Sequence, residues 1–359
     1  MRKDLAVPRV LIAAGGTAGH VVPALAVAER LTAAGTEVTF VGGERAEARL
    51  VPDAGYELRT IRVEGLSRTN PLRAARALAR SAGAIGAAAR IVRELRPAAV
   101  LGGGGYVAGP VGLAAAALRT PLVLAEADSH LGISNRLLAP LARRVCLAFP
   151  ISGRSGARYV ITGRPVPPPA TDVAAARARF GLREGEPCVL VFGGSLGART
   201  INEAAVEAFL AAPFAILHAA GERDYAALRE RVSGARYDLR AYIEDFGQAL
   251  AACDLCVARA GGSIFEIAAA GKPAILVPYP HATADHQSSN ARWMAEAGAA
   301  VIITDRELTP SRLGQEVRAL LGDRSRLAAM AAASAALARP DAAQRIADEL
   351  LAAARERSA

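Results

Sequence analysis

The sequence predicts an α/β fold built from two parallel-sheet domains, and three observations carry this prediction. First, a chain of 359 residues exceeds the roughly 250–300 residues at which a single hydrophobic core stops growing. Second, short apolar runs alternate with longer helical patterns, which is typical of parallel strands covered by helices on both faces. Third, a proline-rich stretch at 163–169 interrupts this alternation near the middle of the chain.

The expected strands are short and apolar, and each precedes a helical pattern. Because 52% of the residues are hydrophobic and 21% are charged, the chain can bury a sizeable core. An aromatic content of 4% disfavours β-sandwiches and propellers. The expected strands are 10–14, 38–41, 98–101 and 122–125 in the first half, and 189–192, 255–258 and 274–277 in the second.

The domain boundaries follow from the proline-rich stretch. Three consecutive prolines, Pro167–Pro169, can continue neither a helix nor an interior strand. We therefore expect a first domain at 1–162, a linker at 163–170 and a second domain at 171–338. The last helical pattern, within 339–359, follows a further proline, and we expect that it can pack back on the first domain.

Charge and cysteine content restrict the class of partner and the compartment. The chain carries 43 basic and 34 acidic residues, a net charge of +9, and nearly all the basic residues are arginines. This balance predicts anionic partners, which include nucleotides, nucleic acids and anionic membranes. The four cysteines are too scattered for a disulfide framework, and Cys253 and Cys256 lack the further ligands of a zinc site. No targeting segment or membrane span is visible, so we expect a cytoplasmic protein.

Glycine loops follow the first expected strand of each half. Residues 15–19 and 193–197 share the pattern G-G-[ST]-x-G. Such a turn before a helix lets backbone N–H groups approach an anion, although it also serves simply as a tight turn. The repeat indicates two Rossmann-like domains with ligands at the carboxyl ends of the strands. Neither loop has the Walker A or G-x-G-x-x-G pattern, so an NAD enzyme is the weaker alternative. A third run, 102–105, ends the strand at 98–101.

These blocks resemble the MurG family of bacterial peptidoglycan glycosyltransferases, within the wider GT-B superfamily. The resemblance covers nearly the whole chain through residues 15–21, 104–110, 193–199 and 259–291, in the order that the family has. It implies a GT-B fold and an inverting transfer of N-acetylglucosamine from UDP-N-acetylglucosamine to undecaprenyl-pyrophosphoryl-N-acetylmuramyl-pentapeptide. A GT-B enzyme with a soluble small-molecule acceptor and a non-transferring nucleotide-binding regulator are the alternatives. The resemblance implies no nucleic-acid partner.

The resemblance also assigns donor and acceptor contacts to particular residues. It implies that the diphosphate meets Ser195, that the main chain of Ile243 reads the uracil and that Arg259 lies over the base. The ribose hydroxyls would bind Glu266, and Gln287 would contact the sugar. Further expected contacts are Thr17, Ala18 and Gly19 with the donor sugar, and Gly104, Gly105 and Tyr106 on the acceptor side.

Two positions depart from the family pattern. Asp128 stands where the family often has an asparagine, and an ionised carboxylate cannot donate a hydrogen bond. The usual linker arginine falls at Pro167, and Arg164, three residues earlier, is the candidate replacement.

The expected chemistry is a single displacement, in which a base takes the proton of the acceptor hydroxyl as the diphosphate leaves. The candidate bases are His20, which we favour because an ordinary histidine pKa of about 6.5 suits this step, and Glu126. No DxD-like acid pair lies near the phosphate loops, so we expect neither a catalytic metal nor a cofactor.

The lipid acceptor requires a place to meet the bilayer. In 67–96, seven arginines alternate with leucine, isoleucine and valine in a pattern compatible with a basic amphipathic helix. We expect either that this segment docks the protein peripherally on the anionic cytoplasmic face of the cell membrane, or that it is an ordinary solvated helix.

Overall fold

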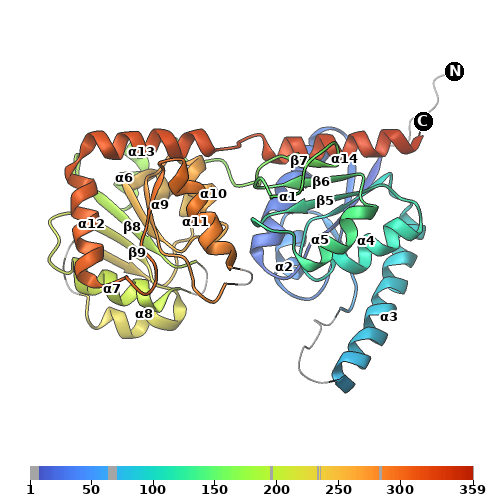
Figure 1. The fold of residues 1–359 in the computed structure, drawn as a ribbon, viewed down its shortest axis with the longest axis horizontal. Helices are drawn as coiled ribbons and strands as arrows, with labels where there is room; N and C mark the ends of the chain where they lie inside the picture. The colour runs from blue at the N-terminus through green and yellow to red at the C-terminus, as the bar shows by residue number, and fades with distance from the viewer. Residues whose placement is uncertain are drawn as a thin grey trace. The chain divides into compact units, whose positions relative to one another are not determined.

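The computed structural model describes residues 8–63, 71–194, 197–232, 234, 236–282 and 285–358, with the side chains of 71–82 and 357–358 left out. The chain divides into two compact units (Figure 1). Unit 1 comprises Met1–Val166 and Arg339–Ala359, and unit 2 comprises Pro167–Ala338. The chain therefore leaves unit 1 at the proline-rich stretch and returns to it for its last helix.

The sheet of unit 1 has seven parallel strands in the described part of the chain, in the order β3-β2-β1-β4-β5-β6-β7. The chain starts in the middle of the sheet at β1 and builds outward on both sides, so the strand order reverses between β1 and β4. In such sheets ligands bind at the carboxyl ends of the strands beside this reversal. The strands are β1 Arg9–Ala13, β2 Glu37–Gly42, β3 Glu57–Thr60, β4 Ala99–Gly102, β5 Leu122–Glu126, β6 Arg144–Leu147 and β7 Tyr159–Ile161.

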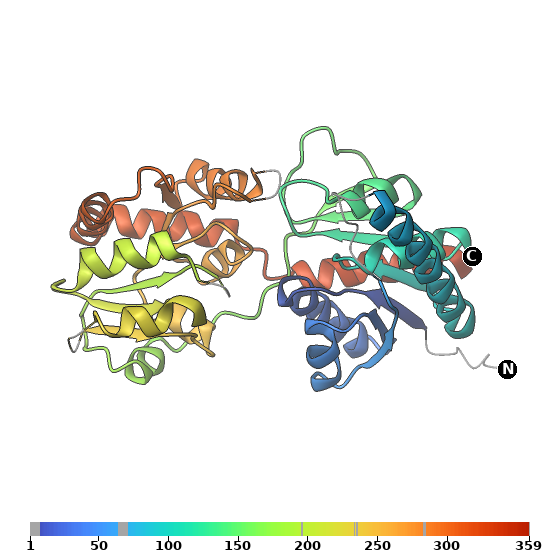
Figure 2. The ribbon, with the colours of Figure 1, turned by 90° about the horizontal axis from the view of Figure 1, so that it is seen from below.

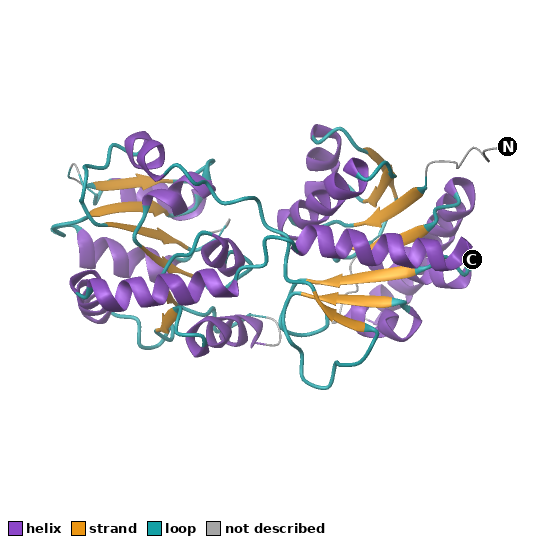
Figure 3. Ribbon diagram, turned by 90° about the horizontal axis from the view of Figure 1, so that it is seen from above, coloured by secondary structure: helices purple, strands orange, loops and turns teal. Residues whose placement is uncertain are grey.

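Helices cover both faces of this sheet (Figures 2 and 3). On one face α1 and the returning helix α14 enclose a core that includes Val10 and Ile12. On the other face α3, α4 and α5 enclose a core that includes Leu11 and Ala13. This alternation along β1 explains why its sequence is apolar from Val10 to Ala13. The helices are α1 Ala18–Ala33, α2 Ala46–Asp53, α3 Pro71–Leu95, α4 Ala108–Ala117, α5 Ile133–Leu138, the 3-10 helix η1 Ala139–Leu141, and α14 Ala342–Ser358.

The sheet of unit 2 repeats the same plan with six parallel strands among its described residues, in the order β10-β9-β8-β11-β12-β13. The strands are β8 Cys188–Phe192, β9 Ala215–Ala219, β10 Tyr237–Arg240, β11 Leu255–Ala258, β12 Ala274–Leu276 and β13 Ala300–Ile302. The helices are α6 Val173–Arg179, α7 Arg199–Phe209, α8 Glu222–Arg229, α9 Phe246–Ala252, α10 Ile264–Ala269, α11 His286–Glu296, α12 Pro310–Gly322 and α13 Arg324–Leu337.

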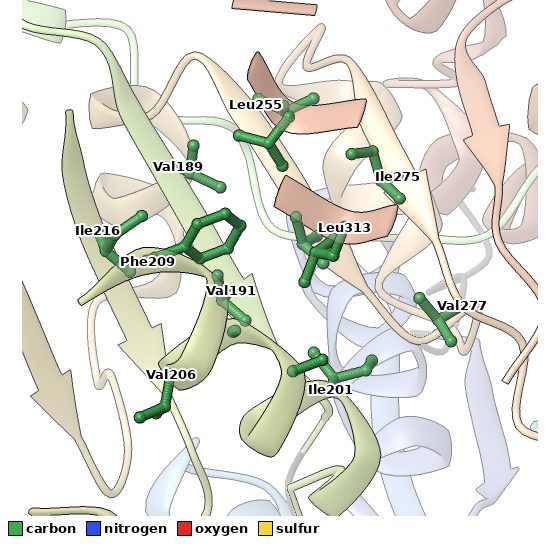
Figure 4. Close-up of a cluster of buried hydrophobic side chains, with 14 of the residues drawn as sticks. Val189, Val191, Ile201, Val206, Phe209, Ile216, Leu255, Ile275, Val277 and Leu313 are labelled. Atoms are coloured by element: carbon green, nitrogen blue, oxygen red, sulfur yellow. The ribbon is translucent and has the colours of Figure 1, made fainter. Parts of the chain in front are cut away.

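The core of unit 2 gathers side chains from α7, α12 and the central strands. Phe209 of α7 and Leu313 of α12 lie in one cluster with Val189, Val191 and Ile216 (Figure 4). Cys253 and Cys256 are also buried in this unit. The two parallel sheets confirm the fold class predicted from the sequence.

Candidate active site

Two glycine loops predicted from the sequence meet at the carboxyl ends of β1 and β4 in unit 1. Gly105, in the loop after β4, has a φ of +79°, and a Cβ there would lie 1.8 Å from the carbonyl oxygen of Gly15. Only glycine allows both this backbone conformation and this approach. The loop after β1 and the loop after β4 therefore touch through their backbones.

His20 is the third residue of α1, and it lies where these two loops meet. A Cβ on Gly104, whose φ is +100°, would lie 2.7 Å from the His20 Nδ1 atom. That Nδ1 atom is buried and has no hydrogen-bond partner among the residues described. Burial first, and then the positive charge of Arg164, lower the pKa of His20, while Asp128 opposes them. The neutral imidazole is thus favoured, and this is the form that can accept a proton.

Glu126 ends β5, and its carboxylate is hydrogen-bonded to the segment that follows the strand. It accepts hydrogen bonds from the backbone N–H of Asp128 at 3.1 Å and of Gly132 at 2.8 Å, and from Asn135 Nδ2 at 3.0 Å. Burial raises the pKa of Glu126, although these bonds act in the opposite direction. The contacts describe a carboxylate that shapes the Asp128 loop, whereas His20 Nδ1 has no hydrogen-bond partner among the described residues.

The remaining predicted residues of this loop region lie at the start of α1. Thr17, Ala18 and Gly19 are exposed. Thr17 occupies the N-cap position, but its hydroxyl accepts no capping hydrogen bond from the backbone of α1. The Gly19 carbonyl accepts a hydrogen bond from Arg164 Nη2 at 2.8 Å.

Glu47, in the first turn of α2, is a residue of this region that the sequence analysis missed. Its fully buried carboxylate accepts hydrogen bonds from Gly16 N at 2.8 Å, Gly43 N at 2.9 Å and the Tyr106 hydroxyl at 2.7 Å. Burial and the contact with Glu47 raise the pKa of Tyr106 to about 12, and Arg45 Cζ lies 4.9 Å from its ring centre. The Gly16 N–H therefore binds an internal carboxylate and is not available to a phosphate.

In unit 2 the described residues predicted to hold the donor lie on segments that follow strands of its sheet. Ile243 is buried just after β10, and Glu266 is half-buried in the first turn of α10, after β11. Gln287, near the start of α11, accepts a hydrogen bond from the backbone N–H of Tyr279 at 3.0 Å through its Oε1 atom. Ser195 lies outside the described residues.

Arg259, directly after β11, is buried and tied to several elements. Its Nη1 donates to the carbonyl oxygen of Val277 at 3.1 Å and to the carboxylate of Asp305, and its Nη2 donates to Thr200 Oγ1 at 2.8 Å. Its Cζ atom is 5.4 Å from the ring centre of Tyr279. The partners Thr200 and Asp305 come from distant parts of the sequence, and nothing in the pattern around them indicated this contact.

Comparison with known proteins identifies the family of this site. The N-terminal domain model of glycosyltransferase family 28 matches residues 10–147, and its C-terminal domain model matches residues 188–346. A relative from Moorella thermoacetica, named UDP-N-acetylglucosamine–N-acetylmuramyl-(pentapeptide) pyrophosphoryl-undecaprenol N-acetylglucosamine transferase, is 44% identical over 96% of this chain and 98% of its own. The chain belongs to glycosyltransferase family 28. A relative of the same name from Nitrosococcus oceani is 43% identical, with the same coverage of both chains.

Solved structures place this family 28 member in the GT-B fold. The crystal structure of Acinetobacter baumannii MurG matches with a TM-score of 0.80 and 32% identity, covering 96% of this chain and 99% of that one. The calicheamicin glycosyltransferase CalG4 matches with a TM-score of 0.72 and 18% identity, covering 97% and 98%. At that identity the second likeness shows the fold alone. Together they confirm the GT-B fold and the resemblance to MurG found in the sequence.

Proposed function

We propose that this chain transfers N-acetylglucosamine from UDP-N-acetylglucosamine to undecaprenyl-pyrophosphoryl-N-acetylmuramyl-pentapeptide, which converts lipid I into lipid II in peptidoglycan synthesis. The observation that carries this proposal is the identity of 43–44%, over 96% of the chain, to two transferases of that name. His20 and the glycine loops at 15–19 and 102–105 lie within the residues matched by the N-terminal domain model, and the loop at 193–197 lies within those matched by the C-terminal one.

The donor half of the proposal uses unit 2. The second glycine loop precedes α7, so a diphosphate there would meet Ser195, backbone N–H groups and the positive end of that helix. The Glu266 carboxylate is a suitable acceptor for the two ribose hydroxyls. Ile243, Arg259 and Gln287 would hold the uracil and the sugar, with Arg259 kept in place by its contacts to Thr200 and Asp305.

The chemical step uses unit 1. His20 accepts the proton of the acceptor hydroxyl as the oxygen of that hydroxyl forms a bond to the anomeric carbon. The bond from that carbon to the diphosphate breaks, its electron pair leaves with UDP, and the configuration inverts. In this scheme Thr17, Ala18 and Gly19 contact the donor sugar, and Asp128 makes a further contact with the substrate. Gly104, Gly105 and Tyr106 border the acceptor.

The lipid acceptor also leads us to propose peripheral contact with an anionic membrane on its cytoplasmic side. Within the described part of the chain, no helix is both long and apolar enough to cross a bilayer. Ile133, Leu137 and Leu141, at every fourth position of α5 and η1, are 56%, 67% and 52% exposed. The exposed Arg136 and Arg143 flank them.

This apolar stripe extends the membrane face expected from the sequence. In unit 1, α4 packs against both α3 and α5, so α3, which lies within the basic segment 67–96, and the stripe belong to one layer of helices. Of that segment, 67–70 and the side chains of 71–82 lie outside the described residues. Exposed apolar side chains beside arginines are what an interfacial contact with anionic lipid requires.

The transferase assignment is tested with purified full-length chain, radiolabelled UDP-N-acetylglucosamine and a short-chain analogue of lipid I. We expect labelled disaccharide product with this donor and none with UDP-glucose. Thermal denaturation should show stabilisation by UDP-N-acetylglucosamine and none by NAD, because only a ligand that binds the native state raises the melting temperature. Stabilisation by the donor without transfer to the analogue would contradict the acceptor assignment and favour a soluble acceptor.

A further inference from the structure

A proline in α1 leaves one backbone acceptor without its helical donor. Within an α-helix, the N–H of each residue donates to the carbonyl four residues earlier. Pro23 lies inside α1 and has no N–H, so the Gly19 carbonyl lacks the bond that the helix would otherwise supply. Arg164 Nη2 donates to this carbonyl at 2.8 Å.

We propose that Arg164 is a positioning residue for the transfer reaction, which binds the carbonyl left vacant by Pro23 and thereby fixes a permanent positive charge beside His20. This inference rests on the proposed function, in which His20 is the base. It gives Arg164, the candidate replacement for the family's linker arginine, a role toward the base instead of a role toward the substrate.

The surroundings of His20 support this role. Gly19 is its direct neighbour in the chain, so a guanidinium anchored at the Gly19 carbonyl cannot move far from the imidazole. Two charged groups act on His20, Arg164 from the segment after β7 and Asp128 from the loop after β5, whereas the loop after β4 presents the uncharged Gly104. Gly19, Pro23 and Arg164 also line one pocket of unit 1, together with Glu126.

The charge of Arg164 affects both the uptake of a proton by His20 and its later release. An always-charged arginine disfavours a second positive charge nearby, so the imidazole stays neutral and ready to accept a proton at lower pH than it otherwise would. After the transfer, the same repulsion favours release of that proton from His20 to solvent.

The test is a histidine titration by NMR of the full-length chain, which reads His20 directly and does not depend on activity. The signal of His20 is assigned with His20→Gln. Arg164→Gln keeps an N–H donor for Gly19 but removes the charge, so we expect a higher His20 pKa and an acidic limb of the pH–rate profile moved to higher pH. Arg164→Lys keeps the charge and should stay near the parent. Arg158→Gln, at an exposed arginine of the same unit, is the matched control.

Pro23→Ala tests the vacant carbonyl separately, since it restores a backbone N–H for Gly19 while Arg164 remains. We expect a His20 shift in the same direction as for Arg164→Gln. An unchanged His20 pKa in Arg164→Gln overturns the proposal, and an unchanged pKa in Pro23→Ala overturns the role of the vacant carbonyl. If the His20 pKa shifts in Arg164→Gln but the parent enzyme transfers nothing to lipid I, the proposed function is overturned. The effect of Arg164 on His20 would still stand.

Discussion

Among single residues, Glu266 bears most directly on the donor proposal. Glu266→Ala removes hydrogen bonds from the ribose hydroxyls to a carboxylate, a loss of about 1.5–3 kcal/mol. We expect KM for UDP-N-acetylglucosamine to rise roughly 10- to 100-fold, with little change in KM for the lipid I analogue. Glu296→Ala, at an exposed glutamate of α11, is the control. An unchanged donor KM in Glu266→Ala would remove Glu266 from the ribose site.

His218, in β9, makes the stability of unit 2 depend on pH. Its Nε2 faces the Asn202 oxygen at 3.0 Å and its Nδ1 faces the Tyr237 hydroxyl at 2.8 Å, which suits a neutral ring. Burial lowers the pKa of His218 to about 4. Below the ordinary pKa of about 6.5, His218 binds a proton in the unfolded chain but stays neutral in the folded chain. The free energy of unfolding therefore falls as the pH drops toward 4.

The expected loss between neutral pH and pH 4 is on the order of 3 kcal/mol from this one group. It is measured by urea unfolding, with the single tryptophan, Trp293 of α11, reporting on unit 2. His218→Gln should flatten the pH dependence, whereas His281→Gln, at an exposed position, should not. Parallel pH profiles for the parent and His218→Gln would show that His218 is not the titrating group.

At the scale of elements, Glu47 joins three loops that follow β1, β2 and β4. Glu47→Gln has nearly the same shape, but its amide places N–H donors against Gly16 N, or against Gly43 N and the Tyr106 hydroxyl, all of which donate. We expect kcat to fall at least tenfold because the loops around His20 lose their arrangement, since a displaced catalytic group costs rate. Donor KM should rise less than in Glu266→Ala, because the proposed contacts of Glu266 and Gln287 with the donor lie in unit 2 and only those of Thr17, Ala18 and Gly19 lie beside the disturbed loops.

The matched control for this prediction is Glu44→Gln, three residues earlier and exposed. Steady-state kinetics with both substrates separate kcat from the two KM values. Parent-like kcat in Glu47→Gln would mean that the loops keep their arrangement without the carboxylate.

The elements also show what the sequence could and could not predict. The glycine loops at 15–19 and 102–105 were predictable because backbone that turns sharply after a strand needs glycine. Glu47 was not, because its partners Gly16 and Tyr106 are far apart in the sequence and meet only when the strands are ordered. The short strands β3 and β13 carried little pattern of their own, since pairing with a neighbouring strand defines them. The roles of the donor residues remain predictions.

At the scale of the whole molecule, membrane contact is the property to test. Changing both Leu137 and Leu141 to Glu removes two apolar side chains, each worth about 1.5–3 kcal/mol when buried, and adds negative charge. We expect binding to vesicles of anionic lipid to weaken at least tenfold in sedimentation, and activity on a short-chain soluble acceptor to persist. Ile161→Glu, at an exposed isoleucine of β7, is the control. Unchanged vesicle binding would show that the stripe is not the membrane face, and the basic segment 67–96 would then be the next surface to test.

The last helix has a consequence for the synthesis of the protein. Ile346, Ala347 and Leu350 of α14 belong to the same core as Val10 and Ile12, although the whole of unit 2 separates them in the sequence. In a nascent chain leaving the ribosome, the part of this face that α14 covers, over β4, β5 and β6, therefore stays exposed until α14 has been translated. Unit 2 is continuous and has all its strands earlier, so it can fold while unit 1 still waits. Chaperone contact during translation should accordingly fall on the part of the chain made first.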